Sequence, residues 1–183
     1  QDESYYLLDA DEEEETFVYL GLKKNVNKME MECDLRAAEK GEKTFPAEKY
    51  VNKIPVKKHD HVLIPAGTVH CSGKNTMVLE ISATPYIFTF KLWDWGRLGM
   101  DGLPRPIHIE HGMKNIQWAR DTKWVYENIV GQQKTLKKTK DCEIERTGLH
   151  SREFIDTIRY TLSGADTISM DDTVHVMNLV EGR

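Results

Sequence analysis

The stretch HDHVLIPAGTVHCSG, residues 59–73, contains the turn signal that decides how this chain folds. Pro65 ends strand pairing because it has no backbone N–H, and Gly67 permits a sharp reversal of the chain. The chain then re-enters a sheet, in which successive side chains point to opposite faces. We therefore expect His70 to point into a β-barrel and Cys71 to point out of it.

Short strand patterns surround this stretch. The runs SYYLL at 4–8 and TFVYLGL at 16–22 flank the acidic run DADEEEE, which predicts a hairpin with an acidic loop. Further strands, rich in β-branched or aromatic residues, are expected at 54–58, 61–65, 76–82 and 87–95. Many short strands at close spacing indicate a sandwich or barrel, so the fold class is mainly β.

Helical patterns interrupt the strands twice. Residues 29–41 predict a short helix that ends at its glycine. In residues 108–118, Ile109, Met113 and Ile116 recur at helical spacing, and Asp121 is the expected N-cap of a following helix.

The chain divides into three parts on these patterns. Residues 1–107 are expected to form the β-barrel, and residues 108–140 a helical segment with a polar, basic linker at 131–140. Strands return at 152–164 and 173–183, so residues 141–183 are expected to begin a second β unit.

Composition narrows the functional classes. The chain has 183 residues and a formal net charge of −5, which argues against a nucleic-acid partner. No run of about 18 apolar residues is present, which argues against a membrane partner. Three widely spaced cysteines without a CxxC pair indicate a reducing, cytoplasmic compartment. Because the chain begins without methionine and both ends fall at strand-like residues, we expect a piece of a longer protein.

A longer run makes the prediction more specific. VLEISATPYIFTFKLWDWGRLGMDGLPRPIHIE, residues 78–110, resembles the type I mannose-6-phosphate isomerases of the cupin superfamily. In that family a Glu-bearing strand leads to T-aromatic-Arg-x-aromatic-Asp and then to DG-x-PR-x-x-HIE. ESYYLLDA, IPAGTVH and HVMNLVEG resemble further segments of the family, the last one the start of its second barrel. The resemblance implies a cupin-type antiparallel β-barrel (jelly roll), a short helical segment and the start of a second β unit.

The resemblance also implies a metal site. In the family, zinc is held by a Gln-x-His pair, a Glu and a final His. Glu3 and His70 stand at the last two positions, and the Gln-x-His pair is expected upstream of Gln1. Mixed nitrogen and oxygen ligation with an open position suits a catalytic zinc. We therefore expect one Zn²⁺ per full-length protein, held weakly by these two ligands alone.

The implied reaction interconverts mannose 6-phosphate and fructose 6-phosphate by moving a proton between C1 and C2. It needs a Lewis acid, a carboxylate or similar base, and a cation for the phosphate or the developing oxyanion. The resemblance assigns the carboxylate to Glu80 and the cation to Lys91, which replaces the family's catalytic arginine. Each residue also has an interpretation without a catalytic role: Glu80 as a surface residue of a strand, and Lys91 as a solvated lysine of a strand.

Departures from the family keep other functions open. Lys91 replaces an arginine, Gln1 replaces a lysine, and the segment TPYIF, residues 84–88, departs from the family and gains about one residue. Arginine and lysine are not equivalent at a bidentate site. The alternative to a sugar-phosphate isomerase is therefore a non-catalytic sugar-binding or sensing cupin. A metal-dependent oxygenase is a weaker alternative, because its iron site usually needs more histidines. Trp93 shares strand parity with Lys91 and is the candidate for stacking on a sugar ring.

Overall fold

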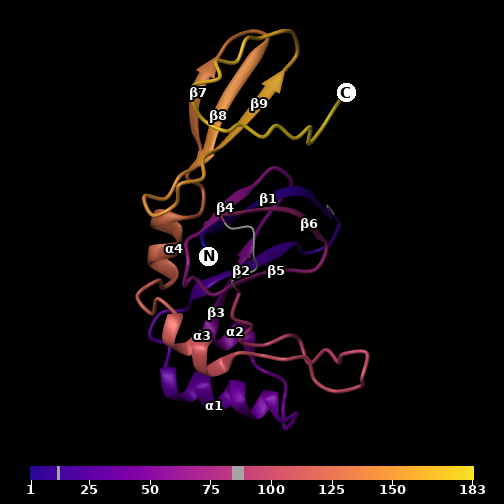
Figure 1. Ribbon diagram of the computed structural model, residues 1–183, viewed down its shortest axis with the longest axis vertical. Helices are drawn as coiled ribbons and strands as arrows, with labels where there is room; N and C mark the ends of the chain where they lie inside the picture. The colour runs from indigo at the N-terminus through magenta and orange to yellow at the C-terminus, as the bar shows by residue number, and fades with distance from the viewer. Residues whose placement is uncertain (12, 84–88) are drawn as a thin grey trace.

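The computed structural model describes residues 1–11, 13–83 and 89–183. The chain forms a body of strands and helices, followed by a separate three-stranded sheet that carries the C-terminus (Figure 1). We call residues 1–130 the N-terminal body and residues 131–183 the C-terminal region. Within the described residues, no helix is long and apolar enough to cross a membrane.

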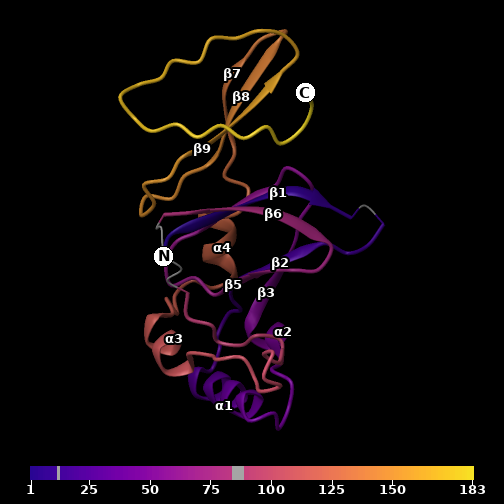
Figure 2. The same ribbon diagram turned by 45° about the vertical axis from the view of Figure 1, so that its right-hand side comes forward.

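The strands of the N-terminal body form two antiparallel three-stranded sheets. In the first sheet β1 (Glu3–Ala10) lies between β4 (His61–Ile64) and β6 (Thr76–Ser82). In the second sheet β2 (Phe17–Leu22) lies between β3 (Val51–Pro55) and β5 (His70–Ser72). Figure 2 shows the two sheets as two layers. The predicted mainly β, antiparallel fold class is confirmed.

The predicted hairpin between the first two strands is wrong. β1 and β2 form where they were expected, but each is the central strand of a different sheet. Residues 17–22 are buried along their whole length, and so are the first five residues of β1. Strands this apolar need a partner on both edges and a layer against the face, which a two-stranded hairpin does not supply.

Two apolar clusters lie on the two faces of the second sheet. The first fills the space between the sheets and includes Leu7, Leu20, Leu63 and Val125. The second lies between the second sheet and the helices. It is formed by Phe17, Tyr19, Leu22, Met31, Leu35, Phe45, Tyr50, Val51, Ile109 and Ile116.

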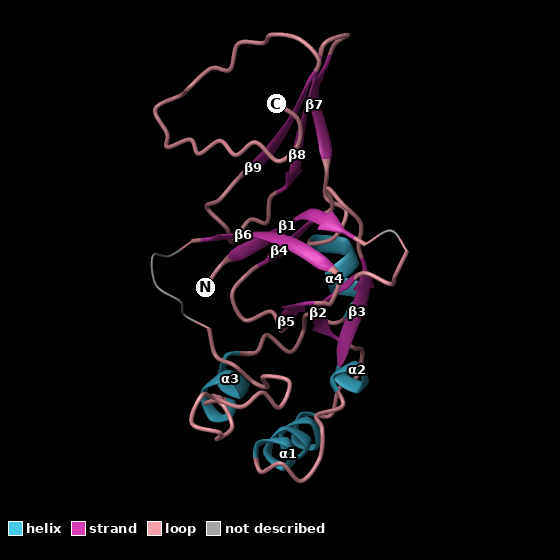
Figure 3. Cartoon of the chain, turned by 90° about the vertical axis from the view of Figure 1, so that its right-hand side faces the viewer, coloured by secondary structure: helices cyan, strands magenta, loops and turns pink. Residues whose placement is uncertain are grey.

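The helices cover the open side of the second sheet and one end of the body (Figure 3). They are α1 (Lys28–Glu39), α2 (Ala47–Tyr50), α3 (Ile109–Asn115) and α4 (Thr122–Asn128). The Asn27 side chain caps α1, and the Asp121 side chain accepts from the Trp124 N–H at 3.1 Å. The predicted helices and the Asp121 cap are therefore confirmed.

The C-terminal region contains β7 (Lys134–Lys138), β8 (Cys142–Gly148) and β9 (Thr157–Leu162), paired in that order. The prediction of a linker at 131–140 is wrong in its middle, because Lys134–Lys138 pairs with β8. Every residue of β7 is exposed, and exposed lysines are typical of a sheet edge that is protected from aggregation.

Two expected strands do not form. Residues 173–183 are almost entirely exposed and have no ladder partner among the described residues. Residues 89–95 form a loop, and the beginning of the strand expected at 87–95 lies outside the described residues. In both runs the local pattern resembles a strand, but their described residues join none of the three sheets.

Candidate functional site

The turn between β4 and β5 forms as the sequence predicts. Gly67 has φ +86°, and the N–H of Thr68 donates to the carbonyl of Pro65 at 3.1 Å. A Cβ at Gly67 would lie 2.7 Å from the Asn115 carbonyl oxygen, so the position requires glycine for both its conformation and its space. The reversal places β5 in the second sheet, opposite β1 of the first.

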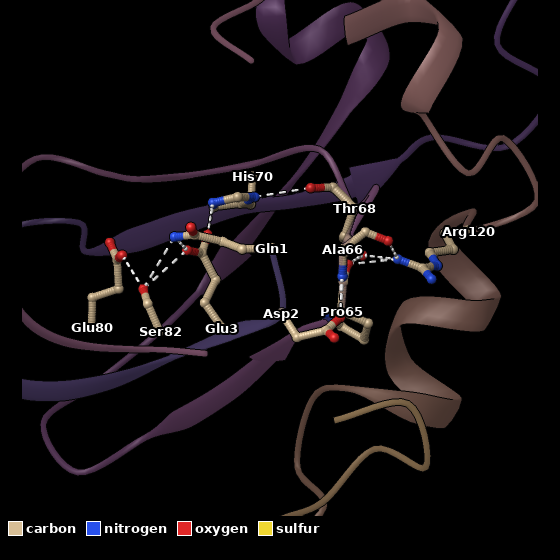
Figure 4. Close-up of polar contacts among 10 residues, drawn as sticks. All are labelled: Gln1, Asp2, Glu3, Pro65, Ala66, Thr68, His70, Glu80, Ser82 and Arg120. Carbon is tan, nitrogen blue, oxygen red and sulfur yellow. Dashed lines mark hydrogen bonds and ion pairs between the residues drawn. The ribbon is translucent and has the colours of Figure 1, made fainter. Parts of the chain in front are cut away.

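His70 and Glu3 meet across the two sheets. His70 Nε2 lies 2.5 Å from Glu3 Oε1, and the other ring nitrogen, Nδ1, lies 2.9 Å from the carbonyl oxygen of Thr68 (Figure 4). The Glu3 side chain is only 3% exposed, and the His70 side chain 20%. The structure therefore brings together the two residues that were predicted as metal ligands.

Glu3 and His70 shift each other's pKa in opposite directions. Burial acts to raise the pKa of Glu3, but the hydrogen bond and charge of His70 outweigh it and bring this pKa to about 2. Burial acts to lower the pKa of His70, yet the hydrogen bond and charge of Glu3 raise it overall. Each group therefore stabilises the charged form of the other.

Gln1, Ser82 and Glu80 extend this polar row along the edge of the first sheet (Figure 4). The Gln1 amide donates to Glu3 Oε2 at 3.0 Å, and the Ser82 hydroxyl donates to Glu80 Oε1 at 2.6 Å. Glu3 is in register with Ser82, and Tyr5 with Glu80, so Glu80 shares a sheet face with Glu3. Glu80 is exposed and lines the same cavity as the Glu3–His70 pair.

Cys71 lies on the opposite face of β5 from His70, as strand alternation predicts. It is in register with Tyr19 and packs against the apolar cluster beneath the helices, whereas His70 is in register with Leu20 of the inter-sheet cluster. Burial raises the pKa of the Cys71 thiol, against a smaller lowering by a hydrogen bond from Trp95. Cys71 is therefore placed away from the Glu3–His70 pair.

Lys91 lines the cavity from the loop that follows the undescribed residues 84–88. Its side chain is 39% exposed, and its ammonium lies 3.4 Å from Asp94 Oδ2. Arg105 also contacts Asp94, at 3.0 Å. The structure thus places Lys91 beside the site but gives its charge a carboxylate partner, and the expected strand parity with Trp93 does not apply in this loop.

The cavity has a volume of about 800 Å³ and mixed walls. One wall carries Glu3, His70 and Glu80, and another carries the aromatic rings of Trp93 and Trp95. Trp93 packs against both Phe45 and Trp95, whereas Trp95 is 42% exposed. The more accessible indole is therefore Trp95, not the Trp93 singled out by sequence.

The metal-ligand set of the described residues is incomplete. In residues 1–11, 13–83 and 89–183, no group of three or more His, Cys, Asp or Glu side chains could hold a metal ion. Glu3 and His70 supply one oxygen and one nitrogen donor, which fit two positions of a mixed zinc site. A catalytic zinc ordinarily takes three protein ligands.

Other contributors to the site carry no sequence signal. Arg120 lies 50 residues after His70, in a helical zone, yet its side chain reaches the turn that precedes β5. Asp2 accepts from the Ala66 N–H at 2.7 Å. Both residues contact backbone groups. Since every residue carries a backbone carbonyl, the sequence does not reveal which carbonyl a distant side chain will contact.

Comparison with known proteins gives consistent matches, although no family model matches the chain. A mannose-6-phosphate isomerase of Streptococcus mutans is 36% identical over 63 residues, which are 34% of this chain and 20% of that protein. A putative mannose-6-phosphate isomerase of Bacillus subtilis is 21% identical over 135 residues, 74% of this chain and 40% of that protein.

The fold also matches a solved structure. The crystal structure of the mannose 6-phosphate isomerase from Bacillus subtilis superposes with a TM-score of 0.64 and 20% identity, over 89% of this chain and 46% of that chain. These similarities confirm the resemblance to mannose-6-phosphate isomerases and the fold class. The chain spans less than half the length of these relatives.

Proposed function

We propose that this protein is a metal-dependent aldose–ketose isomerase of sugar phosphates, with mannose 6-phosphate and fructose 6-phosphate as its substrate pair. The observation that carries the proposal is the Glu3–His70 pair. Two side chains from different sheets converge to 2.5 Å at the wall of a cavity, in a fold shared with the Bacillus subtilis enzyme.

The metal proposed for this site is Zn²⁺, with Glu3 and His70 as ligands. The Nδ1–H of His70 is directed at the Thr68 carbonyl, which leaves Nε2 as the ligating nitrogen. When bound, zinc would supply a Lewis acid that polarises the sugar oxygens. The described residues supply two ligands, so the proposal requires further ligands from outside them.

Glu80 and Lys91 are the proposed catalytic side chains. The Glu80 carboxylate is open to the cavity, where it can accept the C2 proton of an aldose and return it to C1. The Ser82 hydroxyl fixes one oxygen of that carboxylate. Lys91 provides a positive charge for the phosphate or the developing oxyanion.

One observation favours the alternative of a non-catalytic sugar-binding cupin. The Lys91 ammonium pairs with Asp94, so its charge toward a ligand is partly neutralised. A single ammonium also lacks the fork of an arginine, which holds an oxyanion or phosphate through two bonds. Binding without turnover is the behaviour expected of that alternative.

The proposed location is the cytoplasm, and the proposed partner is a small sugar phosphate. Cys33, Cys71 and Cys142 are free thiols, which supports a reducing compartment. The cavity, with a carboxylate-rich wall and an aromatic wall, suits a polar molecule with an apolar ring face.

The test is a coupled assay that converts mannose 6-phosphate to fructose 6-phosphate, with the longest reading frame that encodes this sequence and added zinc. We expect turnover that falls by at least ~10²-fold in His70→Gln and in Glu80→Gln, because each removes a group from the reacting centre. His175→Gln, at an exposed histidine of the C-terminal region, is the matched control and should not change the rate.

The two functions give opposite results in this assay. Zinc binding and sugar-phosphate binding without turnover would support the sugar-binding protein and reject the isomerase. In the isomerase, Lys91→Ala should lower turnover and Lys91→Arg should preserve or raise it, since the arginine restores a bidentate donor.

A further inference from the structure

We infer that Arg120 is a positioning residue that sets the orientation of the His70 ring through the Pro65–Thr68 turn. Arg120 lies at residue 120, between α3 and α4, and is only 5% exposed. Arg120 does not itself line the cavity, although the turn that it contacts does. The inference rests on the proposed function of His70 as a metal ligand.

The Arg120 side chain contacts the turn at successive acceptors. Its Nη1 donates to the carbonyl of Pro65 at 2.6 Å, to that of Ala66 at 2.9 Å and to Thr68 Oγ1 at 2.5 Å (Figure 4). The Thr68 hydroxyl in turn donates to the Pro65 carbonyl at 2.7 Å. One guanidinium nitrogen therefore ties the two ends of the turn together.

The turn then determines the direction of the His70 ring. The carbonyl of Thr68, the residue held by Arg120, accepts from His70 Nδ1 at 2.9 Å. A histidine that donates one ring N–H to a fixed carbonyl has its tautomer and ring plane set by that bond. The remaining nitrogen, Nε2, then points at Glu3 Oε1.

Arg120 is itself held rigidly. Its carbonyl accepts from the Leu22 N–H at 3.0 Å, and its N–H donates to the Gln117 carbonyl at 3.0 Å. The guanidinium lies over the Trp124 ring, 4.9 Å from its centroid. Both the main chain and the side chain therefore lock its position, as a residue that positions another residue requires.

The choice of acceptors is unusual for a buried cation. Among the described residues Arg120 forms no ion pair within 4.0 Å, and Asp2 and Glu153 act on it only through their charge, although buried arginines are ordinarily paired with acids. Asp2 instead holds the same turn from its other side, through the Ala66 N–H. Burial lowers the pKa of Arg120 to about 10, so the group stays charged at neutral pH. The charge is directed to turn carbonyls, which makes the conformation of the turn its main target.

The experiment reads the His70 ring directly. In the chain without metal, NMR of ¹⁵N-labelled histidine should show a slowly exchanging Nδ1–H signal that disappears in His70→Gln. We expect Arg120→Met to abolish this protection and to weaken zinc binding, measured against a chromophoric chelator, by ~10–100-fold. Arg120→Lys keeps the charge but loses the planar group that lies over the Trp124 ring, and should restore the signal only partly.

Two controls separate positioning from simple stability. Arg36→Met removes an exposed arginine that pairs with Glu32 on α1, and should leave the ring signal and the zinc affinity unchanged. Leu35→Ala opens the core beneath the helices and should lower the melting temperature without altering the His70 signal. If Arg120→Met does not fold, Thr68→Val removes only the hydroxyl link and should still increase the exchange of the ring proton.

The outcomes separate this inference from the proposed function. A wild-type His70 signal and zinc affinity in both Arg120→Lys and Thr68→Val would overturn the inference. A wild-type chain that binds no zinc, but whose Nδ1–H protection is lost in the Arg120 variants, would reject the metal proposal and keep the positioning role.

Discussion

The N-terminal body and the C-terminal region are both antiparallel β structures, yet they differ in how much they bury. β1 and β2 are largely inaccessible, whereas every residue of β7 is exposed and β9 is at most half-buried. The body has two sheets, with helices on the open side of the second sheet and at one end of the body, and the C-terminal region has one sheet alone.

The difference shows what a functional site needs from its surroundings. The Glu3–His70 pair requires two sheets that face one another, because its members come from different sheets. A single sheet can form its hydrogen bonds but offers no opposite wall. Leu162, Val174 and Met177 accordingly remain exposed in the C-terminal region.

The largest effect should come from truncating matched leucines in the two regions. Leu20 is 0% exposed between the sheets, and Leu162 is 48% exposed on β9. Leu20→Ala should lower the free energy of unfolding by about 3–4 kcal/mol, because it leaves a cavity. Leu162→Ala should change it by less than about 0.5 kcal/mol. Urea denaturation of both variants checks this, and equal effects would contradict the contrast between the regions.

The next effect concerns the seam between the regions, where His61 of β4 lies against β8. Burial lowers the pKa of His61 to about 4 from 6.5, against a smaller raising contribution from the Thr147 backbone. The unfolded chain therefore binds the proton more tightly, so this contribution is complete above pH 6.5 and is lost as the pH falls toward 4. The gap corresponds to about 3 kcal/mol.

The measurement compares the wild type with His61→Leu by urea denaturation at pH 7.5 and at pH 4. The wild type should lose about 3 kcal/mol more than the variant between these two values. Parallel losses in the two proteins would show that His61 does not titrate at the seam.

The smallest effect comes from two glycines with positive φ. Gly67→Ala should cost about 2 kcal/mol, because φ is +86° and the added Cβ would meet the Asn115 carbonyl. Gly182 has φ +93° in the C-terminal region but nothing within 4 Å, and Gly182→Ala should change stability by less than about 0.5 kcal/mol. Thermal melts of the two variants test this, and a larger loss at Gly182 would mean that the C-terminal segment is part of the cooperative fold.

The sequence predicts local structure well where local chemistry decides it. The Pro65–Gly67 reversal, the Asp121 cap and the strand over 76–82 all form as expected, because each depends on residues close in the chain. The opposite facing of His70 and Cys71 follows from strand alternation alone. The assignment of Glu3 and His70 to one site came from the family resemblance, and the structure brings them together.

Predictions fail where pairing between distant segments decides the outcome. The acidic run at 9–15 has the pattern of a hairpin loop, but β1 and β2 find better partners in β4, β6, β3 and β5. The lysine-rich run at 134–138 has the composition of a linker and becomes a strand because β8 offers it an edge. Residues 173–183 have a strand pattern and find no such edge in the described residues.

By itself, the sequence determined a mainly β chain with a glycine turn before His70, since turn geometry and side-chain alternation are properties of neighbouring residues. Only the tertiary structure decided that Glu3 faces His70, that Lys91 pairs with Asp94, and that Arg120 holds the turn. These contacts join residues 3 to 67 positions apart in the chain, and the contact of Arg120 is with a backbone carbonyl, which every residue type carries.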